Sequence, residues 1–207
     1  FALHPCGEIT GGQMRLDLWN AETTADISTT RGKIHVRSFV HSEQMVIVTQ
    51  LWTEGGEADC RWEWKPAPSE SPRWLFAKQN PDWKAAMPEQ YPLNPPVEVD
   101  STKTEGVSYQ PLQAGGGTAV RWQETHEGDV RTLWVTLKHT YPETNARELS
   151  AKTLDDALRT GYAELQRTHR AWWHAYYPAS FLTLPDGQKE NFYWIQMYKL
   201  ASATRGD

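Results

Sequence analysis

The segment Lys33-Ile-His-Val-Arg-Ser-Phe-Val40 decides the fold class, because its apolar and polar residues alternate with a period of two. Successive side chains of a β-strand point to opposite faces of a sheet, so Ile34 and Val36 share one face. The preceding Thr30-Arg-Gly-Lys33 is typical of a tight turn, and residues 25–29 precede it as a second short strand. The stretch therefore predicts an antiparallel hairpin.

Similar patterns recur along the first two thirds of the chain. They occupy residues 45–52, 60–65, 119–125 and 130–139. Alternation is strict in Cys60-Arg-Trp-Glu-Trp-Lys65, which places Cys60, Trp62 and Trp64 on one face of a strand. Short strands separated by turn signals predict an antiparallel β-sandwich.

A helical pattern replaces the strands near residue 150. Thr153-Leu-Asp-Asp156 is typical of a helix start, because acidic side chains are favourable in the first turn. Apolar residues then recur at three- and four-residue spacing as far as Pro178. The pattern predicts one amphipathic helix of about six turns over residues 153–177, which leaves the sandwich as a linker.

The last segment predicts a helix over residues 190–204 with apolar residues on every side. These residues include Phe192, Tyr193, Trp194 and Ile195. A helix that is apolar all round is expected to be buried on all sides. We therefore expect further elements to cover it, and we expect the chain to be a piece of a longer protein.

These patterns predict a mainly β fold with C-terminal helices. The expected organisation is a sandwich over residues 1–150, a linker helix region over 151–187 and the first helix of a larger helical unit over 188–207.

Composition argues against several classes of function. The formal net charge is −5 and no basic stripe is present, so nucleic-acid binding is not expected. No apolar run approaches the ~18 residues of a membrane span, and the first residues do not form a signal peptide. Eleven tryptophans stand out, and they suit either a large aromatic core or contacts with sugar rings.

The two cysteines indicate neither a disulfide framework nor a metal site. Cys6 and Cys60 are interpreted as free thiols, with Cys60 buried, although a disulfide in an oxidising compartment stays open. A zinc site that includes His4 is disfavoured, because no C-x-x-C or H-x-x-x-H spacing occurs. No metal or other cofactor is expected.

Residues 66–111 form a segment rich in proline and polar residues, too long for an ordinary loop. A long loop on a rigid sandwich is often functional, so Trp74, Trp83 and Tyr91 are candidates for contact with sugar or with a neighbouring domain. A surface loop that packs only on itself remains the alternative.

The C-terminal aromatic residues give the other candidates. Trp172, Trp173 and Trp194 could contact carbohydrate or a helical barrel. Asp186 and Glu190 are the carboxylates nearest to them, and an inverting glycosidase needs two carboxyl groups ~6.5–9.5 Å apart. However, Asp186 precedes a glycine in a turn signal and Glu190 lies in the first turn of a helix, so both are interpreted as structural. No catalytic residue is assigned.

Three segments resemble six-hairpin glycoside hydrolases, namely Met14–Glu22, Gly32–Ser42 and Phe192–Gly206. The likeness is to relatives of the family 95 α-L-fucosidases and to bacterial glycosidases of the same layout. It implies an N-terminal β super-sandwich, linker helices and an (α/α)6 barrel whose first helix, truncated here, matches Tyr198–Arg205. In that family the catalytic carboxylates lie in the barrel, beyond the equivalent of Arg205. The resemblance also favours a periplasmic or secreted location.

Two classes of function follow from these observations. The first is a non-catalytic sandwich and linker of a bacterial glycoside hydrolase, inactive alone, whose partners are the helical barrel of its own polypeptide and carbohydrate. The second is an autonomous β-sandwich carbohydrate-binding module. The terminal helix favours the first, because a free module has no use for a helix that is apolar all round. A bare interaction scaffold remains a third alternative.

Overall fold

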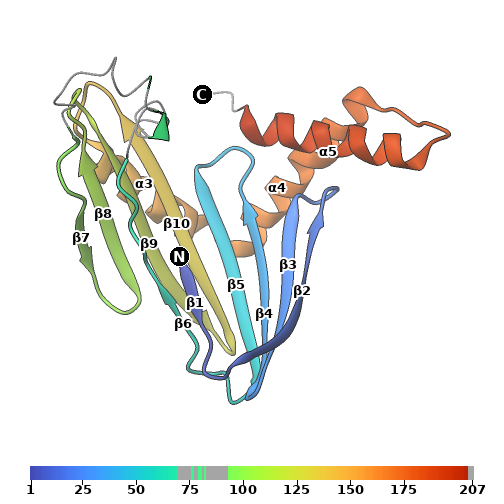
Figure 1. Ribbon diagram of the computed structural model, residues 1–207, viewed down its shortest axis with the longest axis horizontal. Helices are drawn as coiled ribbons and strands as arrows, with labels where there is room; N and C mark the ends of the chain where they lie inside the picture. Colours follow the sequence, from blue (N-terminus) through green and yellow to red (C-terminus); the bar gives the residue numbers. More distant parts are fainter. Residues whose placement is uncertain (70–75, 77–78, 81, 83–92, 205–207) are drawn as a thin grey trace.

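The computed structural model describes residues 1–69, 76, 79, 80, 82 and 93–204. This part of the chain is mainly β, with its helices at the C-terminal end, as the alternating segments predict (Figure 1). All strand pairs in both of its sheets are antiparallel.

The larger sheet has eight strands in the order β2-β3-β4-β5-β10-β9-β8-β7. They are β2 (Ile9–Asp17), β3 (Glu22–Thr29), β4 (Gly32–Val40), β5 (Val46–Gly55), β7 (Glu98–Ser101), β8 (Glu105–Pro111), β9 (Gly117–Glu127) and β10 (Val130–Thr140). The predicted hairpin is confirmed, since β3 and β4 pair with Ser28 opposite Lys33. The sheet centre is closed by a non-local pairing of β5 with β10.

A two-stranded sheet of β1 (Ala2–His4) and β6 (Arg61–Glu63) lies in front of the larger sheet (Figure 1). Leu3, Cys6 and Trp62 pack against a buried cluster of Ile34, Leu51 and Cys60. Cys60 and Trp62 therefore lie on the same face, as the alternation predicts, and that face is directed at the core. Both cysteines are free thiols, and Cys60 is buried.

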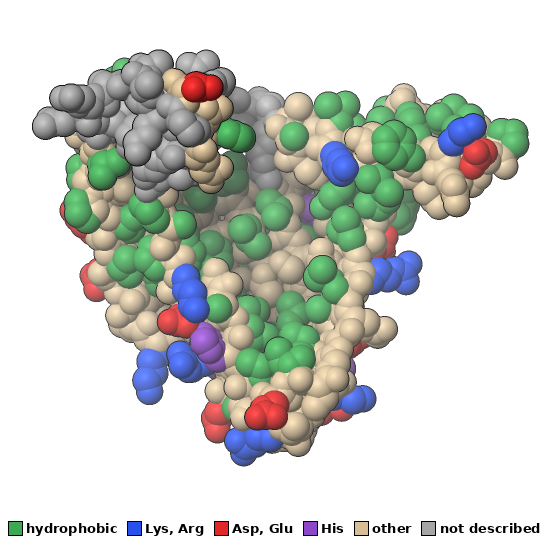
Figure 2. Space-filling view, in the orientation of Figure 1, with side chains coloured by type: hydrophobic (Ala, Val, Ile, Leu, Met, Phe, Trp, Pro, Cys, Tyr) green, Lys and Arg blue, Asp and Glu red, His purple; other side chains and the backbone are tan. Residues whose placement is uncertain are grey.

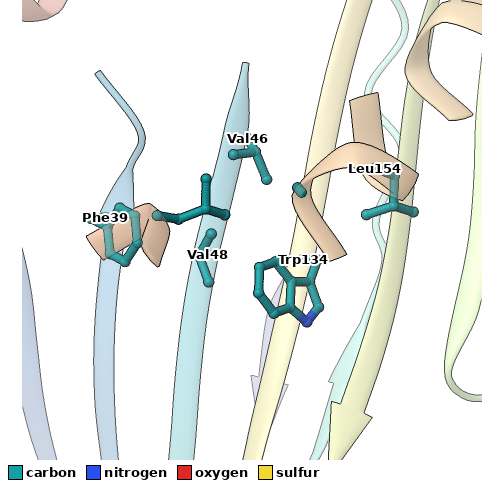
Figure 3. Close-up of a cluster of buried hydrophobic side chains, with 7 residues drawn as sticks. Phe39, Val46, Val48, Trp134 and Leu154 are labelled. Atoms are coloured by element: carbon teal, nitrogen blue, oxygen red, sulfur yellow. The ribbon is translucent and has the colours of Figure 1, made fainter. Parts of the chain in front are cut away.

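Helices α3 (Ala146–Thr160) and α4 (Tyr162–Tyr176) cover the opposite face of the larger sheet. Val46, Val48, Phe39 and Trp134 from the strands pack against Leu154 and its neighbours on the helices (Figure 3). Burying one such side chain stabilises the fold by about 1.5–3 kcal/mol. Val46 and Val48 face the helices whereas Leu51 packs toward the small sheet, so β5 contributes to buried clusters on both faces of the larger sheet.

The prediction of one helix over residues 153–177 is wrong in its start and in its continuity. The helical region begins at Ala146, and Thr153 lies inside α3, where its hydroxyl donates to the Leu149 carbonyl. Gly161 then separates α3 from α4 with a φ of 79°. That backbone conformation is readily adopted only by glycine, so the chain turns where apolar spacing alone predicts continuity. A 3₁₀ turn, η1 (Tyr177–Ser180), follows α4.

Helix α5 (Gly187–Ala203) confirms the predicted terminal helix but begins three residues before the predicted start at residue 190, because the Asp186 side chain caps it by accepting hydrogen bonds from the Gln188 and Lys189 amides. Its expected burial on all sides is not observed within the described chain. Only Ala201 is buried, while Phe192 and Leu200 are 64% and 59% exposed. In Figure 1, α5 extends away from the sheets.

Candidate functional site

Three of the six candidate residues, Trp74, Trp83 and Tyr91, lie outside the described residues. The other three, Trp172, Trp173 and Trp194, all belong to one aromatic cluster formed by α4, η1 and α5.

Trp172 and Trp173 line a small cavity between α4, α5 and the strands β3 and β4. Its volume is about 190 Å³. The Trp173 ring stacks on Tyr198 of α5 with centroids 5.3 Å apart, and Trp172 lies edge-on to Trp173 at 5.0 Å. The structure therefore brings together two of the predicted residues and adds Tyr198.

Trp194 lies elsewhere in the cluster and does not line this cavity. Its ring packs edge-on against Tyr177 at 5.8 Å and contacts Phe181 at 5.7 Å. Trp194 therefore fixes α5 to the end of α4.

Among the described residues, none of those in the cavity wall has a charged side chain. Thr23, Ser38, Ser42 and Ser202 contribute small polar side chains, and Trp173 is almost completely buried. Within the described part of the chain, the indole N–H of Trp173 and the Ser42 hydroxyl have no hydrogen-bond partner. The cavity suits water or a small neutral group, and it offers no acid or base.

A partly buried ion pair holds α4 against the sheet beside this cavity. Arg170 donates to both carboxylate oxygens of Glu22, at 2.5 and 2.8 Å, and Gln166 donates to the same carboxylate. The hydrogen bond to Glu22 raises the pKa of Arg170. Since Ala21 precedes Glu22 and packs against Trp173, the ion pair positions the aromatic cluster.

The histidines of α4 do not form a metal site. His169 is buried and its Nε2 lies 3.2 Å from the Ala21 carbonyl oxygen. Burial lowers its pKa, so the ring is neutral at neutral pH. His174 instead stacks on Trp19 and bonds to Asn20. No group of three potential metal ligands occurs in the described part of the chain.

Asp186 and Glu190 both bond to local backbone, as the sequence predicts. Asp186 caps α5, and a Glu190 carboxylate oxygen accepts from the Leu184 amide at 2.7 Å. Each carboxylate therefore has a structural partner in the backbone around the start of α5.

A second aromatic site was not predicted from the sequence. A cleft of about 780 Å³ lies between the segment that contains β6 and the strands β7 to β9. Its wall includes Trp62, Trp64, Trp122 and Phe1. The Trp64 and Trp122 rings are 5.2 Å apart, and Phe1 contacts Trp64 at 4.9 Å. Figure 2 shows hydrophobic side chains on the front face of the molecule.

Four charged residues, Arg61, Glu63, Lys103 and Glu124, also line the cleft. Glu63 lies 2.5 Å from the His4 ring, and this hydrogen bond lowers the pKa of Glu63. Glu124 pairs with His126 at 3.0 Å and lies 4.0 Å from Arg131. The cleft therefore combines aromatic rings with donors and acceptors of both signs.

The alternation in residues 60–65 was the available signal for this site. The alternation correctly placed Trp62 and Trp64 on one face of the strand. It does not show how much of that face is covered by other strands of the fold. The front layer has two strands in the described part of the chain, and these rings lie at a cleft and are half-buried.

A scan against protein-family models finds no match to this chain, and a search of curated proteins finds none either. The likeness to six-hairpin glycoside hydrolases therefore stays a prediction that rests on the quoted segments. Among the described residues, no helix combines the length and the apolar character needed to cross a membrane.

Proposed function

We propose that this chain is the non-catalytic N-terminal sandwich and linker of a carbohydrate-active glycoside hydrolase, and that it supports the active site of a helical barrel. The observation that carries the proposal is the exposed apolar side of α5.

That side presents Phe192, Ile195 and Leu200 to solvent, and Phe181 lies exposed in the preceding loop. Covering one such side chain contributes about 1.5–3 kcal/mol, so a partner that buries several gains a substantial free energy. A clustered apolar surface of this kind is typical of an interaction site.

A helical partner suits this surface. The ridges of one α-helix pack into the grooves of another, and α5 offers a regular helix of 17 residues. The inner side of α5 is fixed by Trp194, Met197 and Tyr198, so its outer side is already oriented for docking. The resemblance of residues 192–206 to the first helix of an (α/α)6 barrel points to the same partner.

The test uses the complete gene product, with any coding sequence that follows residue 207. Phe192→Ser and Leu200→Ser each remove apolar surface that the proposal buries against the barrel. Each should lower the melting temperature of the complete protein by at least about 3 °C and reduce glycosidase activity.

Met14→Ser is the matched control, because Met14 is exposed on β2, away from α5. It should leave melting temperature and activity unchanged. If the α5 variants behave like this control, or if no helical region follows α5, the proposal fails.

A further inference from the structure

The cleft between β6 and β7 to β9 has the dimensions of a small-molecule site. Its volume of about 780 Å³ falls within the ~300–1,000 Å³ of ordinary ligand pockets. The larger sheet forms its floor through Trp122 and Leu133, and residues 101–104 form one wall.

Aromatic side chains supply a surface for stacking. Trp64 is half-buried and packs beside Trp122, which is almost completely buried and holds it in place. The indole N–H groups of Trp62 and Trp64 have no hydrogen-bond partner. Both indole nitrogens are themselves buried, so polar contacts with a ligand must come from other side chains of the wall.

The charges in the wall select against a charged ligand. Arg61 and Lys103 contribute two positive charges, and Glu63 and Glu124 contribute two negative charges. Among the described side chains of the wall the two signs are balanced, so the cleft offers hydrogen bonds in both directions and favours a neutral ligand.

We infer that this cleft binds a short neutral oligosaccharide, with one sugar ring stacked on Trp64 and its hydroxyl groups bonded to the charged residues of the wall. A pyranose ring has an apolar face of C–H groups for an indole and a rim of hydroxyls that both donate and accept. None of the cleft residues belongs to α5, so sugar binding here can be tested independently of the proposed function.

The experiment measures binding of four neutral hexasaccharides to the 207-residue chain by calorimetry and tryptophan fluorescence. The probes are gluco-, xylo-, manno- and galactohexaose, and oligogalacturonate is the acidic comparison. At least one neutral probe should bind more tightly than oligogalacturonate. Trp64→Ala should weaken that binding by about tenfold or more, which corresponds to loss of one stacked ring.

Two further variants keep the test valid if Trp64→Ala disturbs the fold. Thr104→Trp adds bulk to the wall at an exposed residue and should also weaken binding about tenfold. Trp19→Ala removes a half-exposed tryptophan outside the cleft and should leave affinity unchanged.

The inference is overturned by any of three results. They are no binding of any neutral probe at ~10 mM, preference for oligogalacturonate, and binding that Thr104→Trp does not weaken. It is also overturned if the complete gene product shows this cleft filled by its own polypeptide. The α5 variants Phe192→Ser and Leu200→Ser should leave sugar binding unchanged, which separates this site from the docking surface.

Discussion

Glu57 has no exposed surface, yet its carboxylate is fully partnered. It accepts hydrogen bonds from the Cys6 and Gly7 amides at 2.7 and 2.8 Å and from the Thr29 hydroxyl at 2.6 Å. Burial favours the neutral acid, but the three donors outweigh it and lower the pKa of Glu57. The ionised side chain thereby holds the N-terminal segment against the β3–β4 hairpin.

Glu57→Gln should lower the free energy of unfolding at pH 7 by about 1–3 kcal/mol, because an amide presents a donor to buried N–H groups. The folded-state pKa of Glu57 is lowered, so its stabilisation is present above the unfolded pKa and is lost as pH falls through the folded pKa. Urea unfolding should therefore show a difference between wild type and variant that shrinks below about pH 4.3.

Exposed Glu105 provides the control, and Glu105→Gln should change stability little at either pH. An equal loss at pH 7 and pH 3 for Glu57→Gln would contradict the role of its charge. The sequence did not predict this residue, because Glu54-Gly-Gly-Glu57 reads only as the end of a strand. Its partners are distant in the chain, and nothing local marks it as buried.

At the scale of elements, local periodicity predicted most of the fold. Period-two alternation located the strands at residues 33–40, 45–52 and 130–139, and helical spacing located α4 and α5. It did not predict the pairing of β5 with β10, because that contact depends on distant segments. It also missed the break at Gly161, which lies within a continuous apolar stripe.

Gly161→Ala tests the cause of that break. The residue has a φ of 79° and nothing near the position of an added Cβ, so the cost arises from backbone strain alone. Its φ of 79° and ψ of 160° lie in a region that is essentially restricted to glycine, and an L-residue held there costs about 1–3 kcal/mol. Urea unfolding should show a lower midpoint with an unchanged slope.

Gly187→Ala is the matched control, because Gly187 also has open space around its Cβ position but no positive φ. It should be neutral or stabilise α5 by up to about 1 kcal/mol. If the two variants have the same effect, strain at Gly161 does not explain the break.

At the scale of the molecule, aromatic residues concentrate at two places that the fold separates. One is the junction of α4 and α5, which the sequence predicted through Trp172, Trp173 and Trp194. The other is the cleft beside β6, which it did not predict. The difference is physical: a helix that is apolar all round signals a partner, whereas tryptophans on one strand face fit a core and a cleft equally well.

The purified 207-residue chain should hydrolyse no glycoside in the absence of a barrel domain. Asp186 and Glu190 are the carboxylates nearest in sequence to the C-terminal aromatic residues. Glu190 accepts a hydrogen bond from the Leu184 amide, and Asp186 caps α5. A general acid must instead reach the glycosidic oxygen. Assays of the purified chain with aryl α-L-fucosides and β-galactosides should detect no turnover, and Glu190→Gln should change only stability, by about 0.5–1.5 kcal/mol. Turnover that Glu190→Gln abolishes would instead make this helix terminus an active site and remove the case for a non-catalytic domain.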